Sequence, residues 1–212
     1  MDIVRDITKI AKTYFRNSRG SHDWEHSERV MKLARHLAIE EQADQQVVQL
    51  AAILHDIGRK TQDESNGQLC HAEEGAKLAR DILDNYELAK NVKENIVHCI
   101  KTHRFRNAHK PETIEAKVLY DADKLDSIGA VGIGRAFLFA GEIGAKLHNK
   151  DADISKTKAY TKEDTAYREF IVKLSKVKER MLTPAGRKIA LERHNFMVCY
   201  FDRLNLEVEG KI

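Results

Sequence analysis

The stretch VVQLAAILHDIG, residues 47–58, combines a helix typical of a buried core with two polar residues at its end. An apolar run typical of a buried helix ends in the pair His55-Asp56, and Gly58 marks the end of that helix. A carboxylate held against a hydrophobic core without a partner is strongly disfavoured, and so is an unpaired buried charge of any kind. A cation shared by the two side chains removes the penalty, so the doublet predicts a metal site.

Further ligand candidates lie far from the doublet along the chain. His26 falls in the first turn of a predicted helix, and Asp121 and Asp123 stand near the end of another. Consecutive helical residues point about 100° apart, so His55 and Asp56 can bind one ion only if it lies over the last turn of their helix. The alternative is that the histidines are ordinary core residues and the aspartates are helix caps.

Two imidazoles and two carboxylates form a ligand set without thiolate. Such a set favours Mn, Fe, Co, Ni, Mg or catalytic Zn over a structural zinc. A bound ion of this kind activates water and polarises a phosphoryl oxygen. We therefore expect His55 and Asp56 to be catalytic, and hydrolysis of a phosphoester or phosphoanhydride to be the reaction.

The composition argues against nucleic-acid-binding, disulfide-bonded and membrane-spanning proteins. The 212 residues carry 36 basic and 33 acidic side chains, so no basic stripe indicates a nucleic-acid partner. Cys70, Cys99 and Cys199 show no paired spacing, which favours a reducing compartment over a disulfide framework. Neither a signal peptide nor an apolar stretch long enough for a membrane is evident. We expect a cytoplasmic protein with no membrane partner.

Apolar residues recur at three- and four-residue spacing, which predicts an all-α fold with about nine helices in a single domain, residues 1–212. Asp44 is a predicted N-cap of the third helix, and Asp23 of the second. The expected helices span 2–16, 24–42, 44–57, 71–84, 89–103, 112–125, 127–147, 163–181 and 184–207. We expect loops at residues 59–69 and 148–164. The second could be a lid over a binding site or a mobile surface loop.

Three glycines, Gly129, Gly132 and Gly134, invite comparison with a dinucleotide-binding loop. That loop requires a preceding strand, whereas these glycines lie in a helical context. We expect them instead to let a helix approach its neighbours closely.

The motifs SHDWEHSERV (21–30), AAILHDIGRK (51–60) and DADKLDSIGAVGIGRAF (121–137) resemble the HD-domain metal-dependent phosphohydrolase superfamily. KLSKVKERMLTPAGRKIALERHNFM (173–197) is similar to the C-terminal helices of a small stand-alone bacterial branch that includes nucleotide pyrophosphohydrolases. The resemblance implies a compact helical bundle with a metal-binding core at about 20–137, on which C-terminal helices (163–207) pack. It also implies a divalent metal and a small phosphorylated substrate, often a nucleotide. The residues that match the ligand positions are His26, His55, Asp56 and Asp123.

A second ion is an open alternative to a single one. Binuclear relatives place further ligands between the doublet and the last aspartate, where this chain has His71, His98 and His103. His98 and His103 differ by five positions and cannot share a helix face, so we expect His71 and His103 to bind the second ion. Asp56 would then bridge the two ions.

Other polar residues near the ligands are candidates for supporting roles. Asp121 and Asp126 could orient a ligand, although either is also a credible structural residue. His194 is expected to be a packing residue. The cations that could neutralise phosphate oxygens are Lys60, Arg104, Arg106, Lys124 and Arg135.

Two other functions share the same ligand set. Six ligands of this type also hold a di-iron centre in oxygenases related to the superfamily. A non-enzymatic nucleotide sensor could use the pocket for binding alone and respond through the 148–164 loop.

Overall fold

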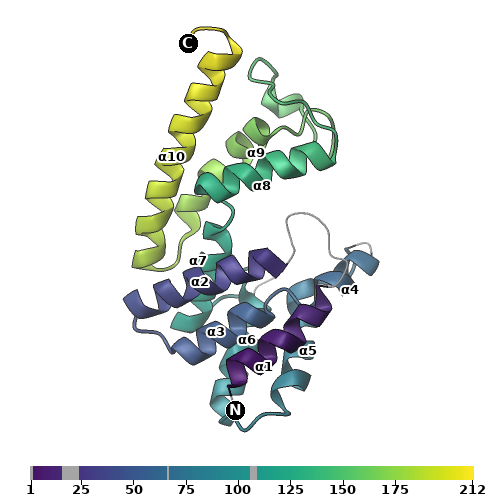
Figure 1. Cartoon of the computed structure of the whole chain (residues 1–212), viewed down its shortest axis with the longest axis vertical. Coiled ribbons are helices and arrows are strands. Elements are labelled where there is room, and N and C mark those ends of the chain that lie inside the picture. The colour runs from purple at the N-terminus through teal and green to yellow at the C-terminus, as the bar shows by residue number, and fades with distance from the viewer. Residues whose placement is uncertain (1, 16–23, 66, 106–108) are drawn as a thin grey trace. The chain divides into compact units, whose positions relative to one another are not determined.

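The computed structural model describes residues 2–15, 24–65, 67–105 and 109–212, and within these ranges every regular element is a helix (Figure 1). The predicted all-α class is confirmed. Asp23, a predicted cap, lies outside the described residues. The α-helices are α1 (Ile3–Tyr14), α2 (Trp24–Glu40), α3 (Gln45–Leu54), α4 (Arg59–Glu64), α5 (His71–Leu83), α6 (Lys90–Thr102), α7 (Ile114–Leu125), α8 (Gly129–Glu142), α9 (Ala166–Val172) and α10 (Pro184–Val208), with 3₁₀ segments η2 (Ile154–Lys156) and η3 (Leu174–Arg180).

Two expected elements differ from the structure. The stretch expected as a loop over 59–69 begins with the short helix α4, so that prediction is wrong for its first half. The helix expected over 163–181 is two elements, α9 and η3. The chain divides into two compact units, one of Met1–Asp123 with Leu182–Ala185 and one of Lys124–Met181 with Gly186–Ile212. A single domain over 1–212 stays a prediction.

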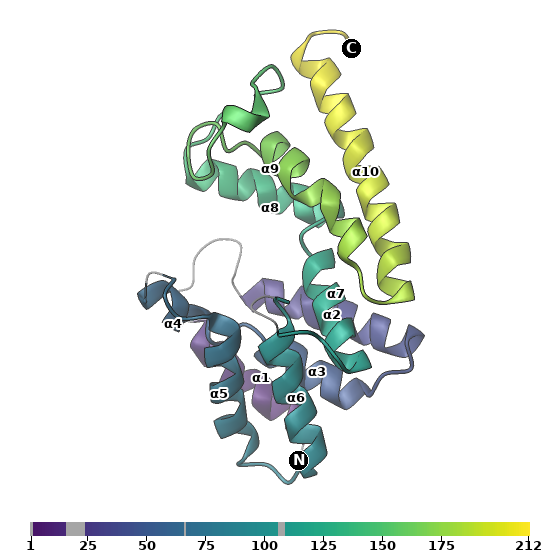
Figure 2. The same ribbon diagram turned by 180° about the vertical axis from the view of Figure 1, so that it is seen from behind.

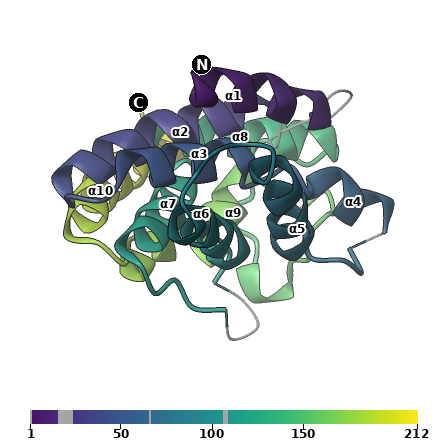
Figure 3. The same cartoon turned by 90° about the horizontal axis from the view of Figure 1, so that it is seen from below.

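Helix α3 is the centre of the first unit. Its residues from Leu50 to Leu54 are all buried, as a helix that is apolar on every side requires. It packs against α1, α2 and α6, and Figure 3 shows these helices arranged around it. Asp44 caps α3 as predicted, because its carboxylate accepts from the amides of Gln46 and Val47.

Two buried carboxylates fix α7 within the first unit. Glu115, at the start of α7, accepts from the Asp44 amide and from the Asn95 side chain, both at 3.0 Å. Asp121, near its other end, accepts from the amides of Leu182 and Thr183 at 2.8 Å. The Glu115 bonds hold the start of α7 to the N-cap of α3 and to α6, and the Asp121 bonds hold its other end to residues 182 and 183. The same helix carries Asp123.

In the second unit, α8 lies beside α9, and Figure 2 shows this pair from behind. The rings of Phe170 on α9 and Phe201 on α10 stack at 4.6 Å between centroids. Close approach explains Gly132, where a Cβ would lie 2.2 Å from the Ser127 carbonyl oxygen. Gly129 has a φ of +78° and a Cβ there would meet the Arg193 side chain at 2.9 Å, whereas a Cβ on Gly134 would meet nothing within 4 Å. The close-approach prediction therefore holds for Gly129, which faces Arg193 of α10, whereas Gly132 relieves a contact with the turn before its own helix.

Partly or fully buried polar contacts fix the 148–164 segment of the second unit. Arg168 donates to Asp164 at 2.7 Å and to the Thr157 hydroxyl at 2.6 Å, and Thr165 donates to the Asn149 side chain at 2.5 Å. Its role as a lid stays a prediction. Over the described part of the chain, none of the helices combines the length and the hydropathy needed to cross a membrane.

Candidate metal centre

The His55-Asp56 doublet lies where α3 ends and the chain turns toward α4. Both side chains are completely buried. Gly58 makes the turn possible, because a Cβ there would lie 2.4 Å from the His71 carbonyl oxygen and 2.5 Å from the Gly75 nitrogen. The absence of a side chain at position 58 therefore lets the start of α5 approach Asp56.

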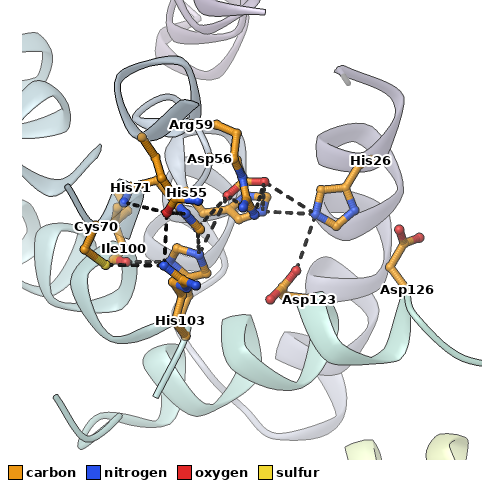
Figure 4. A network of polar contacts seen from close by, with 12 residues as sticks. His26, His55, Asp56, Arg59, Cys70, His71, Ile100, His103, Asp123 and Asp126 are labelled. Atoms are coloured by element: carbon orange, nitrogen blue, oxygen red, sulfur yellow. Dashed lines mark hydrogen bonds and ion pairs between the residues drawn. The ribbon is translucent and has the colours of Figure 1, made fainter. Parts of the chain in front are cut away.

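The first donor group contains His26, His55 and Asp123, whose ligand atoms lie within 4.8 Å of one another. His26 Nε2 lies 3.3 Å from Asp123 Oδ1 and 3.4 Å from His55 Nε2. Figure 4 shows these side chains converging from α2, the end of α3 and the end of α7. The spacing suits one cation coordinated by all three.

The second donor group contains Asp56, His71 and His103, with ligand atoms again within 4.8 Å. His71 Nε2 lies 3.2 Å from Asp56 Oδ1 and 3.2 Å from His103 Nε2. The other oxygen of Asp56, Oδ2, lies 3.8 Å from Nε2 of both His26 and His55. Asp56 thus presents one oxygen to each group.

The Nδ1 atoms of three histidines in these groups face acceptors. His55 Nδ1 lies 2.8 Å from the Ala52 carbonyl oxygen, and His103 Nδ1 lies 2.6 Å from the Ile100 carbonyl oxygen. His71 Nδ1 lies 2.8 Å from Oε1 of Gln62. A neutral imidazole that donates from Nδ1 has a lone pair on Nε2. These Nε2 lone pairs face one another and carboxylate oxygens, and electron-rich atoms in such positions repel one another unless a cation lies between them. The residues therefore fit a divalent metal.

The pKa shifts of four donors, His55, Asp56, His71 and His103, also favour the protonation states that bind metal. Burial lowers the pKa of His55 and of His71, and it lowers that of His103 well below its usual value, with neighbouring imidazoles adding to the effect. Burial acts to raise the pKa of Asp56, but the charges of His55 and Arg59 outweigh it and hold that pKa well below the usual range. Neutral imidazoles and an ionised carboxylate are the states that bind metal.

Arg59, at the start of α4, faces the centre and was missed by the sequence interpretation. Its Nη2 lies 3.3 Å from each oxygen of Asp56, and its Nε is buried without a hydrogen-bond partner. Its position three residues after Asp56 would have indicated that the two side chains meet, but only if a helix had been predicted there. Lys60, chosen instead, is exposed and pairs with Glu64 at 3.7 Å.

The remaining candidates of the first unit have different positions relative to the donor groups. Asp121 binds the chain before α10 and lies outside both donor groups, whereas Asp123 lies within one. His98 accepts from the Glu112 amide at 3.1 Å. Arg104 donates to Gln62 at 3.1 Å.

The other predicted residues belong to the second unit or lie outside the described chain, and their roles at the site stay predictions. Arg106 is not among the described residues. Lys124, Asp126 and Arg135 belong to the second unit, where Arg135 Nη1 donates to Asp126 Oδ2 at 2.7 Å. His194 is also in the second unit, near the ring of Phe170.

Comparison with known proteins gives one consistent result. The family profile of the HD domain matches residues 23–128. Protein YpgQ of Bacillus subtilis is 36% identical to this chain over 212 residues, which is 98% of this chain and 94% of that protein. The crystal structure of B. subtilis YpgQ in complex with ADP has a TM-score of 0.73 and 30% identity, covering 96% of this chain and 94% of that one. The crystal structure of an HD-superfamily hydrolase from Bacillus thuringiensis has a TM-score of 0.77 and 25% identity, covering 97% and 96%.

Proposed function

This chain belongs to the HD-domain family, as its motifs predicted, and from that premise we propose that it is a metal-dependent phosphohydrolase acting on a nucleotide or similar phosphorylated metabolite. The observation that carries the proposal is the convergence of six donor side chains from five parts of the fold on one buried place. Ordinary core histidines would each have a hydrogen-bond donor or a neutral partner facing Nε2. Here imidazole nitrogens face carboxylates and one another.

The two donor groups would hold two divalent ions. His26, His55 and Asp123 would bind the first, and His71 with His103 would bind the second. Asp56 would contribute one oxygen to each ion, since its oxygens already face opposite groups. Bound divalent ions lower the pKa of coordinated water and stabilise charge on phosphoryl oxygens.

Residues of the chain would supply the remaining functions of the site. The Arg59 guanidinium lies at the centre with an unsatisfied Nε, and its side chain is 22% exposed, so an incoming phosphate could reach it. Arginine binds phosphate oxygens through a planar fork of N–H donors. We assign Arg59 to the phosphoryl group of the substrate and Asp56 to the placement of both ions.

A nucleotide substrate is supported by the YpgQ structure, which contains ADP and covers nearly the whole of this chain. That ligand belongs to YpgQ, and its transfer to this chain is part of the proposal. Cleavage of the α–β phosphoanhydride bond of a nucleoside triphosphate would release pyrophosphate. Cleavage of the β–γ bond, or of the phosphoester of a nucleoside monophosphate, would release orthophosphate.

The proposal is tested by activity after metal removal and reloading. Chelated protein, reloaded separately with Mn²⁺, Co²⁺, Ni²⁺, Fe²⁺, Zn²⁺ or Mg²⁺, is assayed against nucleoside mono-, di- and triphosphates with product identification. We expect hydrolysis that needs the metal and is lost in the His55→Ala, Asp56→Ala double variant. Undiminished hydrolysis by the chelated double variant would refute the proposal.

Other outcomes identify the two alternatives. Stable iron binding with O₂ consumption and no phosphate release would indicate a di-iron oxygenase, which the six-ligand set also accommodates. Thermal stabilisation by a nucleotide with every metal tested, but without product, would indicate a sensor. Either result would replace the phosphohydrolase proposal.

A further inference from the structure

Gln62, on α4, makes an unusual concentration of contacts beside the second donor group. Its Oε1 lies 2.8 Å from His71 Nδ1 and 3.3 Å from the His71 amide nitrogen. The same oxygen accepts from Arg104 Nη1 at 3.1 Å. A carbonyl oxygen facing three nitrogens has a defined orientation, because only the oxygen end of the amide can accept from all of them.

Two other histidines of the donor groups, His55 and His103, have Nδ1 partners that are not side chains. His55 and His103 are each the residue that ends a helix, and each bonds the carbonyl oxygen three residues earlier in its own helix. Those carbonyls belong to the last helical turn, where backbone acceptors lack an amide partner. The tautomers of His55 and His103 are therefore set by the backbone.

His71 has the opposite position, because it begins α5. A residue at the start of a helix has free amides near it rather than free carbonyls, so the backbone of α5 offers its ring no acceptor. The acceptor comes instead from Gln62 on the neighbouring helix α4, which packs against α5. The orientation of this one ligand thus depends on a side chain that mutation can remove.

We propose that Gln62 is a positioning residue that holds the His71 ring with Nδ1 protonated and Nε2 facing Asp56 and His103, and so sets the affinity of the second donor group for its ion. The inference rests on the two-ion site of the proposed function. Partners that orient metal-binding histidines typically contribute about 10–100-fold to metal affinity. Loss of Gln62 should therefore affect the second ion and leave the first unchanged.

Stepwise Mn²⁺ titration by calorimetry tests this in the full-length protein. We expect two binding steps in the wild type, and in Gln62→Ala a second step weakened by about 10–100-fold with an unchanged first step. Gln62→Glu keeps an acceptor oxygen near Nδ1 and should restore the second step. Gln68→Ala, an exposed glutamine in the same segment, is the matched control and should titrate like the wild type.

A second measurement does not depend on the metal. Imidazole ¹⁵N spectra of the metal-free protein should show His71 protonated at Nδ1 in the wild type and in Gln68→Ala, and a mixture of tautomers in Gln62→Ala. Urea unfolding of each variant separates this effect from loss of the fold.

Each outcome bears on either Gln62 or the two-ion site. Two unchanged steps and an unchanged His71 tautomer in Gln62→Ala would overturn the role of Gln62 while leaving the two-ion site in place. Equal weakening of both steps would also overturn it, because that result indicates a general structural effect. A wild type that binds only one ion, with His71 protonated at Nδ1, would instead overturn the two-ion proposal and the metal-affinity role with it.

Discussion

Asp121 and Asp123 stand two residues apart on α7, and the structure predicts opposite effects of mutating them. Asp121 is fully buried, and its oxygens accept from the amides of Leu182 and Thr183 and, at 2.6 Å, from the Thr183 hydroxyl. Asp123 instead faces His26 in the first donor group. The first residue should therefore govern stability, and the second should govern metal binding.

The magnitude for Asp121→Ala follows from its partners. Two amides lose a charged acceptor, and each buried donor left unsatisfied costs about 1–3 kcal/mol. The Thr183 hydroxyl can rotate, so it adds less. We expect the free energy of unfolding to fall by about 3–5 kcal/mol, with a smaller loss in Asp121→Asn, which keeps one acceptor oxygen.

Asp123→Ala is the matched comparison. We expect its unfolding free energy to change by about 1 kcal/mol or less, because the Asp123 side chain is 16% exposed and reaches solvent. Its affinity for the first ion should fall by more than about 100-fold, since a direct ligand matters more than the residues that orient ligands.

The assay combines urea unfolding of metal-free protein, followed by circular dichroism, with Mn²⁺ titration at a urea concentration where each variant is folded. An Asp121→Ala variant that kept wild-type stability and lost metal would refute the division of roles between the two aspartates. So would an Asp123→Ala variant that bound metal like the wild type.

Three further predictions concern the same unit. Gly58→Ala should lower the free energy of unfolding by about 1–3 kcal/mol, because the new Cβ would clash with backbone atoms that cannot move easily. The urea midpoint of the variant measures this loss. The metal-free protein should lose stability as the pH falls below about 6.5. Burial lowers the pKa values of His55, His71 and His103, so the unfolded chain binds more protons than the folded chain in that range. Each extra proton lowers the free energy of unfolding by up to about 1.4 kcal/mol per pH unit. A urea midpoint that rises on acidification would contradict this prediction. Arg59→Ala should reduce kcat/KM for the phosphorylated substrate by roughly 10–100-fold, the value of one charge-assisted hydrogen bond, with partial recovery in Arg59→Lys. Unchanged kinetics in Arg59→Ala would remove it from the site.

The sequence indicated six donor side chains that the structure brings together, because metal binding restricts residue type and position together. That they bind ions stays a prediction. His55 and Asp56 could be placed at a helix end from the apolar run before them and the glycine after them. His71 and His103 are expected together from the family resemblance and from the five-residue spacing that separates His98 from His103 on a helix, and the structure brings both to Asp56. Few roles besides metal binding suit several buried imidazoles that surround one carboxylate.

The residues around the ligands were harder to predict. Helix α4 has only six residues, all polar, and begins without a side-chain cap, so its sequence carries neither periodicity nor a start signal. Arg59 and Gln62 both lie on it and were missed for that reason. Without an expected helix, Lys60 could not be distinguished from Arg59, because closeness to Asp56 in sequence does not show which side chain lies on the same helix face as Asp56.

The pairing of Asp126 with Arg135 was also beyond sequence reasoning. Both residues were assigned to the site from their closeness to Asp123 along the chain. The division of contacts after Asp123 assigns them to the second unit, where they form an ion pair, and their role at the site stays a prediction. No pattern of spacing marks where one compact unit ends inside a continuous helix.

Metal content tests the central claim most directly. The wild-type protein and the Asp56→Asn variant, an isosteric change at the residue shared by both donor groups, are loaded with Mn²⁺, desalted and analysed by elemental mass spectrometry. The account predicts two bound ions per chain in the wild type and close to none in a folded Asp56→Asn variant. Equal metal content in the two proteins, or a wild type that retains no divalent ion, would contradict it.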